Sequence, residues 1–329
     1  MDTRDTVEQA ELRRTARALA SGLGPATVAG LDDTDRRARL ADATRAAGWT
    51  ELRDDAGDGA PVASGVEAGI VVEALGRAVA DVPLVGPLLA TDLARRAGVT
   101  IEPGAVLAFS ADLVDPGAAV AVDVAPGGAP VYAVVDDRMV ATDAPAAAGG
   151  SDLTRTVAPV ARASGRPLGR VLGADDLDAW RALGLALTAA DLVGAMRGVV
   201  DLTVAYASDR RQFGVPVGSF QAVQHLLAEA HCLVEGAHSA TLHATWAVDA
   251  LDPAAALMAG RVAKAYAARA ARTVGETAVQ VHGGIGNTWE CIVHVYLRRA
   301  LLSSQWFGDD GAQLRAIAAA RTGGADGLP

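Results

Sequence analysis

The pattern of apolar and polar positions divides the chain into three parts. In the first hundred residues, apolar residues recur at helical spacing in four segments, 6–20, 33–48, 63–79 and 88–96. The first of them stops at SGLGP, where glycine and proline interrupt the pattern. We therefore expect an N-terminal helical domain over residues 1–98.

Between residues 99 and 160 the helical spacing disappears. The segments VLAFSADL, AAVAVDVA and PVYAVVDD are short valine-rich runs, and PG, PGG and DD separate them. Such runs with turn residues between them are typical of strands. The pattern predicts a reduced middle β domain of three to five strands over residues 99–169, with a loop at APAAAGG.

From residue 177 onward the helical spacing returns in longer segments, at 177–208, 219–248, 253–282, 288–302 and 312–320. A glycine-rich tail that we expect to fray follows them. Helices of about 30 residues are typical of antiparallel bundles, so residues 170–329 are expected to form a C-terminal four-helix bundle. Apolar residues lie on more than one face between residues 219 and 282, which favours an oligomer built through the bundle. The expected fold class is mainly α with a small β unit.

Composition and charge narrow the classes of function. The chain is 51% hydrophobic but only 4% aromatic, and its formal charge of −10 argues against nucleic acid and anionic membranes as partners. The charged start MDTRDTVEQAELRR has no apolar core, and no run of 18 uninterrupted apolar residues occurs. We expect neither a signal peptide nor a membrane span. Cys232 and Cys291 are expected to be buried, reduced thiols of a cytoplasmic protein.

The segment RRQFGVPVGSFQ connects two of the long helices. The guanidinium groups of Arg210 and Arg211 could each bind two phosphate oxygens. Ser219 could cap the next helix, whose N-terminus would add partial positive charge. A plain turn, in which the arginines balance the dipole of the preceding helix, fits the same residues. Both interpretations stay open at this point.

A second glycine cluster, QVHGGIGNTWE, also lies between two helices. Gly283 and Gly284 would let the backbone approach a phosphate closely. The cluster follows a helix rather than a strand, so it is not a dinucleotide-binding fingerprint of the Rossmann type. Taken alone, the cluster is a weak signal, and a tight helix–helix turn is the better explanation.

His231, Glu235 and His238 share one helix face, at a spacing that imitates a metal site. No second group of ligands accompanies them in the sequence, so we expect no bound metal. No serine lies in a nucleophile-elbow context, and serine hydrolase chemistry therefore has no support.

Taken together, the two glycine-containing segments resemble the acyl-CoA dehydrogenase family. RRQFGVPVGSFQAVQHLLAEA is similar to its RxxFGxxxxxFQ…LA segment, and AKAYAARAARTVGETAVQVHGGIG to its AK…A…QxxGGxG segment. AGWTEL and VVEALGRAVADVPLVGPLLA resemble its N-terminal aGW turn and EELGR…P helix. The resemblance covers nearly the whole chain and keeps the family's order of motifs.

The resemblance implies a flavoprotein with FAD as its cofactor. In this family the FAD of one subunit lies against a partner subunit, whose arginine and glycine segments hold the ADP half. The residues that the resemblance implies for FAD binding are Arg210, Gln212, Phe213, Gln221, Gln280, Val281, Gly283 and Gly284. They would serve a flavin whose reactive ring lies in another chain.

The general base of the family is not found at either of its known positions. One is a glutamate in a YEG context after GGxG, and the aligned residue here is Phe307, whose phenyl ring cannot abstract a proton. The other lies on the first long helix of the bundle and falls at about Gly184, with Leu185 in place of a frequent arginine. Asp309, beside Asp310, is a weak substitute. We expect no catalytic residue in this chain.

The middle domain also departs from the family, since no segment resembles its G-x-K-x-(W/Y)-I-(T/S)-N flavin strand. These losses resemble the non-catalytic subunit of heteromeric (α2β2) actinobacterial acyl-CoA dehydrogenases, which act on bulky acyl-CoA esters such as steroid side chains. The implied partners are a full-length homologue, an acyl-CoA substrate, and electron-transfer flavoprotein or a similar acceptor. A homomeric enzyme with a non-standard base and a flavin-free scaffold protein remain the alternatives.

Overall fold

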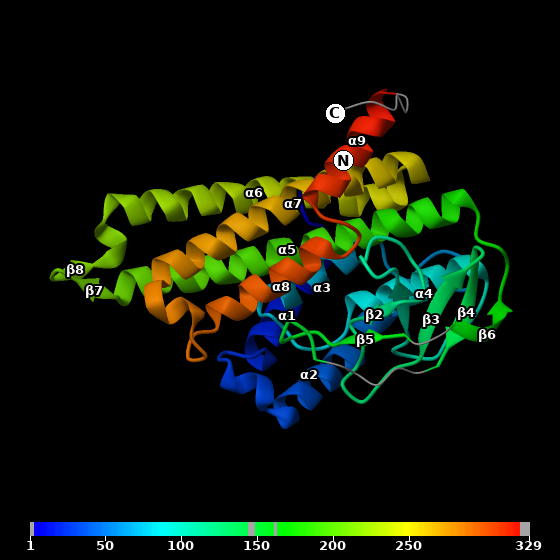
Figure 1. Ribbon diagram of the computed structural model, residues 1–329, viewed down its shortest axis with the longest axis horizontal. Helices are drawn as coiled ribbons and strands as arrows, with labels where there is room; N and C mark the ends of the chain where they lie inside the picture. Colours follow the sequence, from blue (N-terminus) through cyan, green and yellow to red (C-terminus); the bar gives the residue numbers. More distant parts are fainter. Residues whose placement is uncertain (1–2, 144–148, 161–162, 323–329) are drawn as a thin grey trace.

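The structure is a computed structural model that describes residues 3–143, 149–160 and 163–322. Figure 1 shows N-terminal helices and a small sheet packed along one side of a bundle of long helices. The predicted fold class is therefore confirmed. Most of the loop expected at APAAAGG, and the glycine-rich tail from residue 323, lie outside the described residues.

The first three N-terminal helices begin at side-chain caps that the sequence supplies, whereas the fourth has no such cap. The Thr6 hydroxyl accepts a hydrogen bond from the Gln9 amide, and the Gln9 side chain accepts one from the Thr6 amide. Ser64 and Glu67 form the same reciprocal box at the third helix. The four helices are α1 (Val7–Leu23), α2 (Thr34–Ala46), α3 (Gly65–Arg77) and α4 (Val85–Ala97).

The middle unit is a six-stranded sheet in the order β5-β2-β1-β3-β4-β6, in which β1 and β3 are parallel and the other pairs antiparallel. The expectation of three to five strands is thus wrong. The strand without an apolar pattern is the edge strand β6, which contains Gly165 and Pro167. Proline is tolerated there because an edge strand leaves amides unpaired. The strands are β1 (Val106–Phe109), β2 (Val120–Val122), β3 (Val131–Val135), β4 (Arg138–Thr142), β5 (Val157–Pro159) and β6 (Ala163–Leu168).

Five helices follow: α5 (Ala174–Asp209), α6 (Gln221–Ala250), α7 (Pro253–His282), α8 (Val293–Gln305) and α9 (Asp310–Thr322). Helix α5 packs against α3, α6, α7 and α8. It is long and apolar enough to cross a membrane, but 89% of its most apolar stretch is buried inside the protein, as in a core helix. The domain limits at residues 98 and 169 stay predictions.

The two cysteines depart from the expectation of buried helical thiols. Cys232 is exposed on α6, and Cys291 is half-buried in the turn before α8. The helix predicted from residue 288 begins at Val293. A short 3-10 helix, η4 (Gly283–Asn287), and a turn over residues 288–292 precede it.

A buried ionic network joins the three parts of the chain. The Asp191 carboxylate on α5 accepts hydrogen bonds from Arg299 at 2.7 and 3.0 Å and from the Ser303 hydroxyl at 2.7 Å. It also lies 3.0 Å from the guanidinium of Arg155, which comes from the middle unit. Arg299 donates in addition to the carbonyl of Ala80, between α3 and α4, at 2.8 Å. These contacts fix the sheet and the N-terminal helices onto the bundle.

We expect acid to weaken the fold through two buried carboxylates, Asp191 and Asp92. Burial alone would raise both pKa values, but the arginines around each carboxylate lower its pKa to about 2. Each therefore contributes stability above the ordinary pKa of 3.8, and this contribution is lost as the pH falls through about 2. Urea midpoints measured between pH 6 and pH 2 should stay level above about pH 4 and then fall. Asp191→Asn should remove part of this fall; an unchanged profile would contradict the assignment.

Candidate functional site

The segment after α5 forms a small exposed hairpin. Arg211–Gln212 (β7) pairs with Val215–Pro216 (β8), and the turn between them holds Phe213 and Gly214 at positive φ. Phe213 is 93% exposed and meets Phe220 edge to face, at 6.3 Å between ring centroids. Val215 and Phe220 are also exposed, and an apolar patch of neighbouring residues is typical of a surface that a partner covers.

The predicted cap at Ser219 is wrong. Ser219 lies in a 3-10 turn, and its hydroxyl donates to the carbonyl of Pro216 at 2.6 Å. Helix α6 begins at Gln221 with no side-chain cap. The amide of Val223 donates to the carbonyl of Phe220 at 3.0 Å, and no side chain caps the amides before it.

The glycine segment lies at the same end of the bundle (Figure 1). Helix α7 ends at His282, whose ring stacks on Tyr206 at 4.2 Å and whose carbonyl accepts a hydrogen bond from the Tyr206 hydroxyl at 3.3 Å. Tyr206 lies one helical turn before Arg210, which follows the last residue of α5. The structure thus brings the two predicted segments together. We call residues 210–221 and 280–287 the clamp loops.

The clamp loops present donors that the rest of the chain does not use. The side chains of Arg210 and Arg211 are exposed and make no hydrogen bond or ion pair with any residue that the structure describes. Gly283 has a φ of 64°, and a Cβ added to it or to Gly284 would meet open space. Both glycines are exposed. Free guanidinium groups beside an open glycine backbone suit an anionic ligand such as a pyrophosphate.

The other residues predicted for the cofactor lie in the same two loops. Gln212, Gln221 and Gln280 are exposed, and Val281 is half-buried. Phe307 and Gly184 lie elsewhere, beyond the C-terminal end of α8 and on α5. Helix α8 has 13 residues, so it spans about 20 Å between the glycine segment and the turn that carries Phe307.

The two positions expected for a base meet in an aromatic cluster of Phe109, Trp180, Trp306 and Phe307. The Phe307 ring lies 5.2 Å from Phe109 and 5.3 Å from Trp180, and Phe307 is 3% exposed. An ideal Cβ on Gly184 would lie 2.1 Å from Phe307 Cζ. The ring therefore fills the space into which a side chain at position 184 would extend. The amide of Phe307 donates to the carbonyl of Leu113 at 2.8 Å and fixes this turn.

Gly184→Ala should therefore destabilise the chain by about 1–3 kcal/mol, the usual cost of overpacking a core. Phe307→Ala should cost about 3–5 kcal/mol through the cavity it leaves. In the double variant the new methyl group enters that cavity, so the combined loss should be smaller than the sum. Urea denaturation of the three variants measures this coupling. Additive losses would show that the two positions do not share one space.

Asp309 has a structural partner at the start of α9. Its carboxylate accepts a hydrogen bond from the amide of Ala312 at 2.7 Å, which is the geometry of a helix N-cap. Among the metal-like residues on α6, Glu235 pairs with Arg197 at 3.1 Å and His238 with Glu73 at 3.4 Å. No group of three potential metal ligands occurs in the described part of the chain.

Sequence reasoning missed a buried lysine beside this turn. Lys264 of α7 donates to the carbonyls of Ser303 and Trp306, at the C-terminal end of α8. Burial lowers its pKa to about 7. The available signal was a charged residue of α7 between Ala263 and Ala265, one helical turn before Ala267 and Ala268. Lys264 holds the turn that places Phe307.

The comparisons with known proteins agree with this fold. A family model described as the C-terminal domain of acyl-CoA dehydrogenases matches residues 183–321. Acyl-CoA dehydrogenase IpdE2 of Mycolicibacterium smegmatis is 34% identical over 262 residues, which are 77% of this chain and 78% of the relative. A chain of the ChsE4-ChsE5 complex from Mycobacterium tuberculosis has a TM-score of 0.80 at 23% identity, over 100% of both chains. A chain of a Tcur3481-Tcur3483 steroid ACAD variant has a TM-score of 0.79 at 23% identity, over 97% of this chain and 99% of that one.

The 34% identity to IpdE2 over 77% of this chain is sufficient to show the family. The chain belongs to the acyl-CoA dehydrogenase family, whose members are oxidoreductases that act on CH–CH bonds.

Proposed function

We propose that this chain is the non-catalytic subunit of a heteromeric FAD-dependent acyl-CoA dehydrogenase. Its role would be to supply the clamp loops to FAD whose ring lies in a full-length homologous partner. One observation carries the proposal. Phe307 stands at one of the two positions expected for the base, and its ring fills the space beside Gly184, which is the other. The side-chain donors of Arg210 and Arg211 in the clamp loops have no partner among the described residues.

The clamp loops fit the ADP half of FAD. Arg210 and Arg211 offer planar donors to the pyrophosphate, and Gly283 and Gly284 leave the backbone open to close approach. Phe213 would pack against the partner or the adenosine. When bound, FAD would accept a hydride from the β-carbon of the substrate. This chain would hold the cofactor and leave the α-proton to a carboxylate of the partner.

We take the substrate to be an acyl-CoA thioester, desaturated between the α and β carbons, and infer that its acyl group is bulky. Support comes from two structural neighbours. Both are described as pairs of proteins, and one of them as a steroid ACAD. Electron-transfer flavoprotein or a similar carrier would then reoxidise the cofactor. A cytoplasmic location fits the two free thiols.

Two alternatives make different predictions. A homomeric enzyme that used Asp309 as its base would bind FAD without a partner, although that carboxylate already caps α9. A flavin-free scaffold would keep the fold and bind no FAD even in the presence of a homologous partner. Co-expression with a full-length homologue separates both from our proposal.

Arg210→Ala tests the clamp directly. It should weaken FAD retention by the complex by about 1.5–3 kcal/mol, the range for a hydrogen bond to a charged group. The remaining flavin should still be reducible, because the substitution leaves the reactive ring untouched. Equilibrium dialysis of FAD measures the loss. Arg272→Ala, an exposed arginine on α7, is the control and should retain FAD as the wild type does. Equal retention by both variants would contradict the assignment of Arg210.

A further inference from the structure

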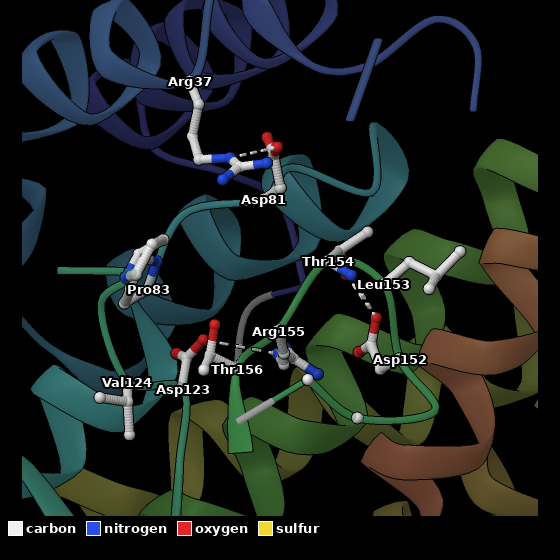
Figure 2. A pocket seen from close by; sticks show the side chains of 13 residues that line it. Arg37, Asp81, Pro83, Asp123, Val124, Asp152, Leu153, Thr154, Arg155 and Thr156 are labelled. Carbon is white, nitrogen blue, oxygen red and sulfur yellow. Dashed lines mark hydrogen bonds and ion pairs between the residues drawn. The ribbon is translucent and has the colours of Figure 1, made fainter. Parts of the chain in front are cut away.

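A cleft lies between the N-terminal helices and the sheet, and no residue of the clamp loops lines it. It consists of two adjoining cavities of about 190 Å³ and 630 Å³, and the smaller one is drawn in Figure 2. Arg37, Asp81, Pro83 and Pro126 line both cavities. The larger volume lies within the range of small-molecule sites. We call the two cavities together the interdomain cleft.

Asp152, in the smaller cavity, has a free acceptor. Its Oδ1 accepts hydrogen bonds from the amide and the hydroxyl of Thr154, at 2.8 and 2.7 Å, and Figure 2 shows this contact. Its Oδ2 has no hydrogen-bond partner in the described structure, and water cannot easily supply one because the residue is only 2% exposed. A buried carboxylate oxygen without a donor is costly. The missing partner is therefore a hydrogen-bond donor.

The neighbouring charges in the cleft are already paired. Arg37 Nε lies 3.0 Å from Asp81 Oδ2, and Asp81 also binds Arg36. Arg155 lies 3.0 Å from Asp191 and 3.7 Å from Asp123. Since these guanidinium groups have carboxylate partners and Asp152 keeps a free oxygen, the site favours a hydrogen-bond donor over an anion.

The larger cavity offers an apolar wall and a second acceptor. The Oδ1 atom of Asp54 is buried without a partner, and burial together with the charge of Glu51 raises the pKa of Asp54. Five prolines line this cavity, and their fixed φ angles make its wall stiff: Pro83, Pro87, Pro103, Pro126 and Pro130. A preformed apolar wall with few polar groups is typical of small-molecule sites.

We propose that the interdomain cleft binds a small, uncharged, apolar molecule that carries a hydroxyl group. The hydroxyl donates to Asp152 Oδ2, and the apolar body lies against the prolines of the larger cavity. Asp54 supplies an acceptor for a second hydroxyl. This binding site is independent of the clamp loops and of the function proposed for them.

Isothermal titration of the full chain with two probes of matched size tests the site. 1-Adamantanol should bind saturably, and 1-adamantanecarboxylate should bind at least about tenfold more weakly because its charge faces Asp152. In Asp152→Asn the amide nitrogen, a donor, either takes the place of the free oxygen or faces Thr154 in place of Oδ1. In both cases the side chain loses one acceptor oxygen. It should weaken adamantanol binding by about tenfold or more, the factor for a hydrogen bond to a charged group.

Two further variants keep the outcome interpretable. Ala41→Leu, at a half-buried position of α2 in the larger cavity, should fill the space of the apolar body and abolish binding in a chain that still folds. Asp35→Asn, at an exposed position of the same helix, is the matched control and should bind like the wild type. The proposal is overturned if adamantanol shows no saturable binding up to its solubility limit. Equal binding of the carboxylate, or undiminished binding by Ala41→Leu, would overturn it as well.

Discussion

Asp191→Asn should destabilise the chain by about 3–5 kcal/mol, the usual cost of breaking a buried ion pair from one side. The substitution keeps the size of the side chain and removes its charge. Arg155 and Arg299 would then remain buried, 3.0 and 2.7 Å from a neutral group. Because these arginines connect the sheet to α8, the loss should appear in the unfolding of the middle unit and the bundle together.

The same helix provides the control for this prediction. Asp201 of α5 pairs with Arg77, but its side chain is 57% exposed, so Asp201→Asn should cost less than about 1 kcal/mol. Urea denaturation followed by circular dichroism gives both values. Similar losses for the two variants would show that the network around Asp191 contributes no more than a surface pair.

In the assembled complex, removing the general-base carboxylate of the partner should lower the rate of flavin reduction by at least about 10²-fold. Asp309→Asn in this chain should leave the rate within about a few fold, since the Asp309 carboxylate serves as the cap of α9. Phe307→Ala should also leave the rate nearly unchanged, provided that the variant is assayed while folded. Stopped-flow measurement of flavin reduction by an acyl-CoA substrate distinguishes these outcomes.

Asp310→Asn, next to the cap, is the control for local disturbance of α9. A large loss of rate in Asp309→Asn, with normal FAD content and a normal rate in Asp310→Asn, would show that this chain carries its own base. The non-catalytic role proposed above would then be wrong.

The sequence was sufficient for the order of the elements, because helical spacing and capping residues act locally. Thr6 and Ser64 begin helices where the pattern indicated, and the glycines after His282 end α7. The edge strand β6 was missed since its Gly165 and Pro167 remove the alternating pattern. Its place depends on pairing with β4 across a bulge, which is a tertiary contact.

The candidate site was predictable in its parts but not in its arrangement. Motif resemblance located Arg210 and Gly283, whereas the stacking of Tyr206 on His282, which brings their loops together, needs the structure. Likewise, the sequence showed Phe307 and Gly184 only as two separate positions at which the base of the family is missing. The Phe307 ring fills the space beside Gly184 because α5 packs against the turn after α8, and this packing is seen only in the structure.

Native mass spectrometry, combined with flavin absorbance, tests the central claim most directly. The chain would be purified alone and after co-expression with a full-length acyl-CoA dehydrogenase homologue. We expect the chain alone to be colourless, and the complex to be yellow, with both subunits present in equal numbers and FAD bound. A yellow assembly of this chain alone, with one FAD per subunit and acyl-CoA dehydrogenase activity, would contradict the account.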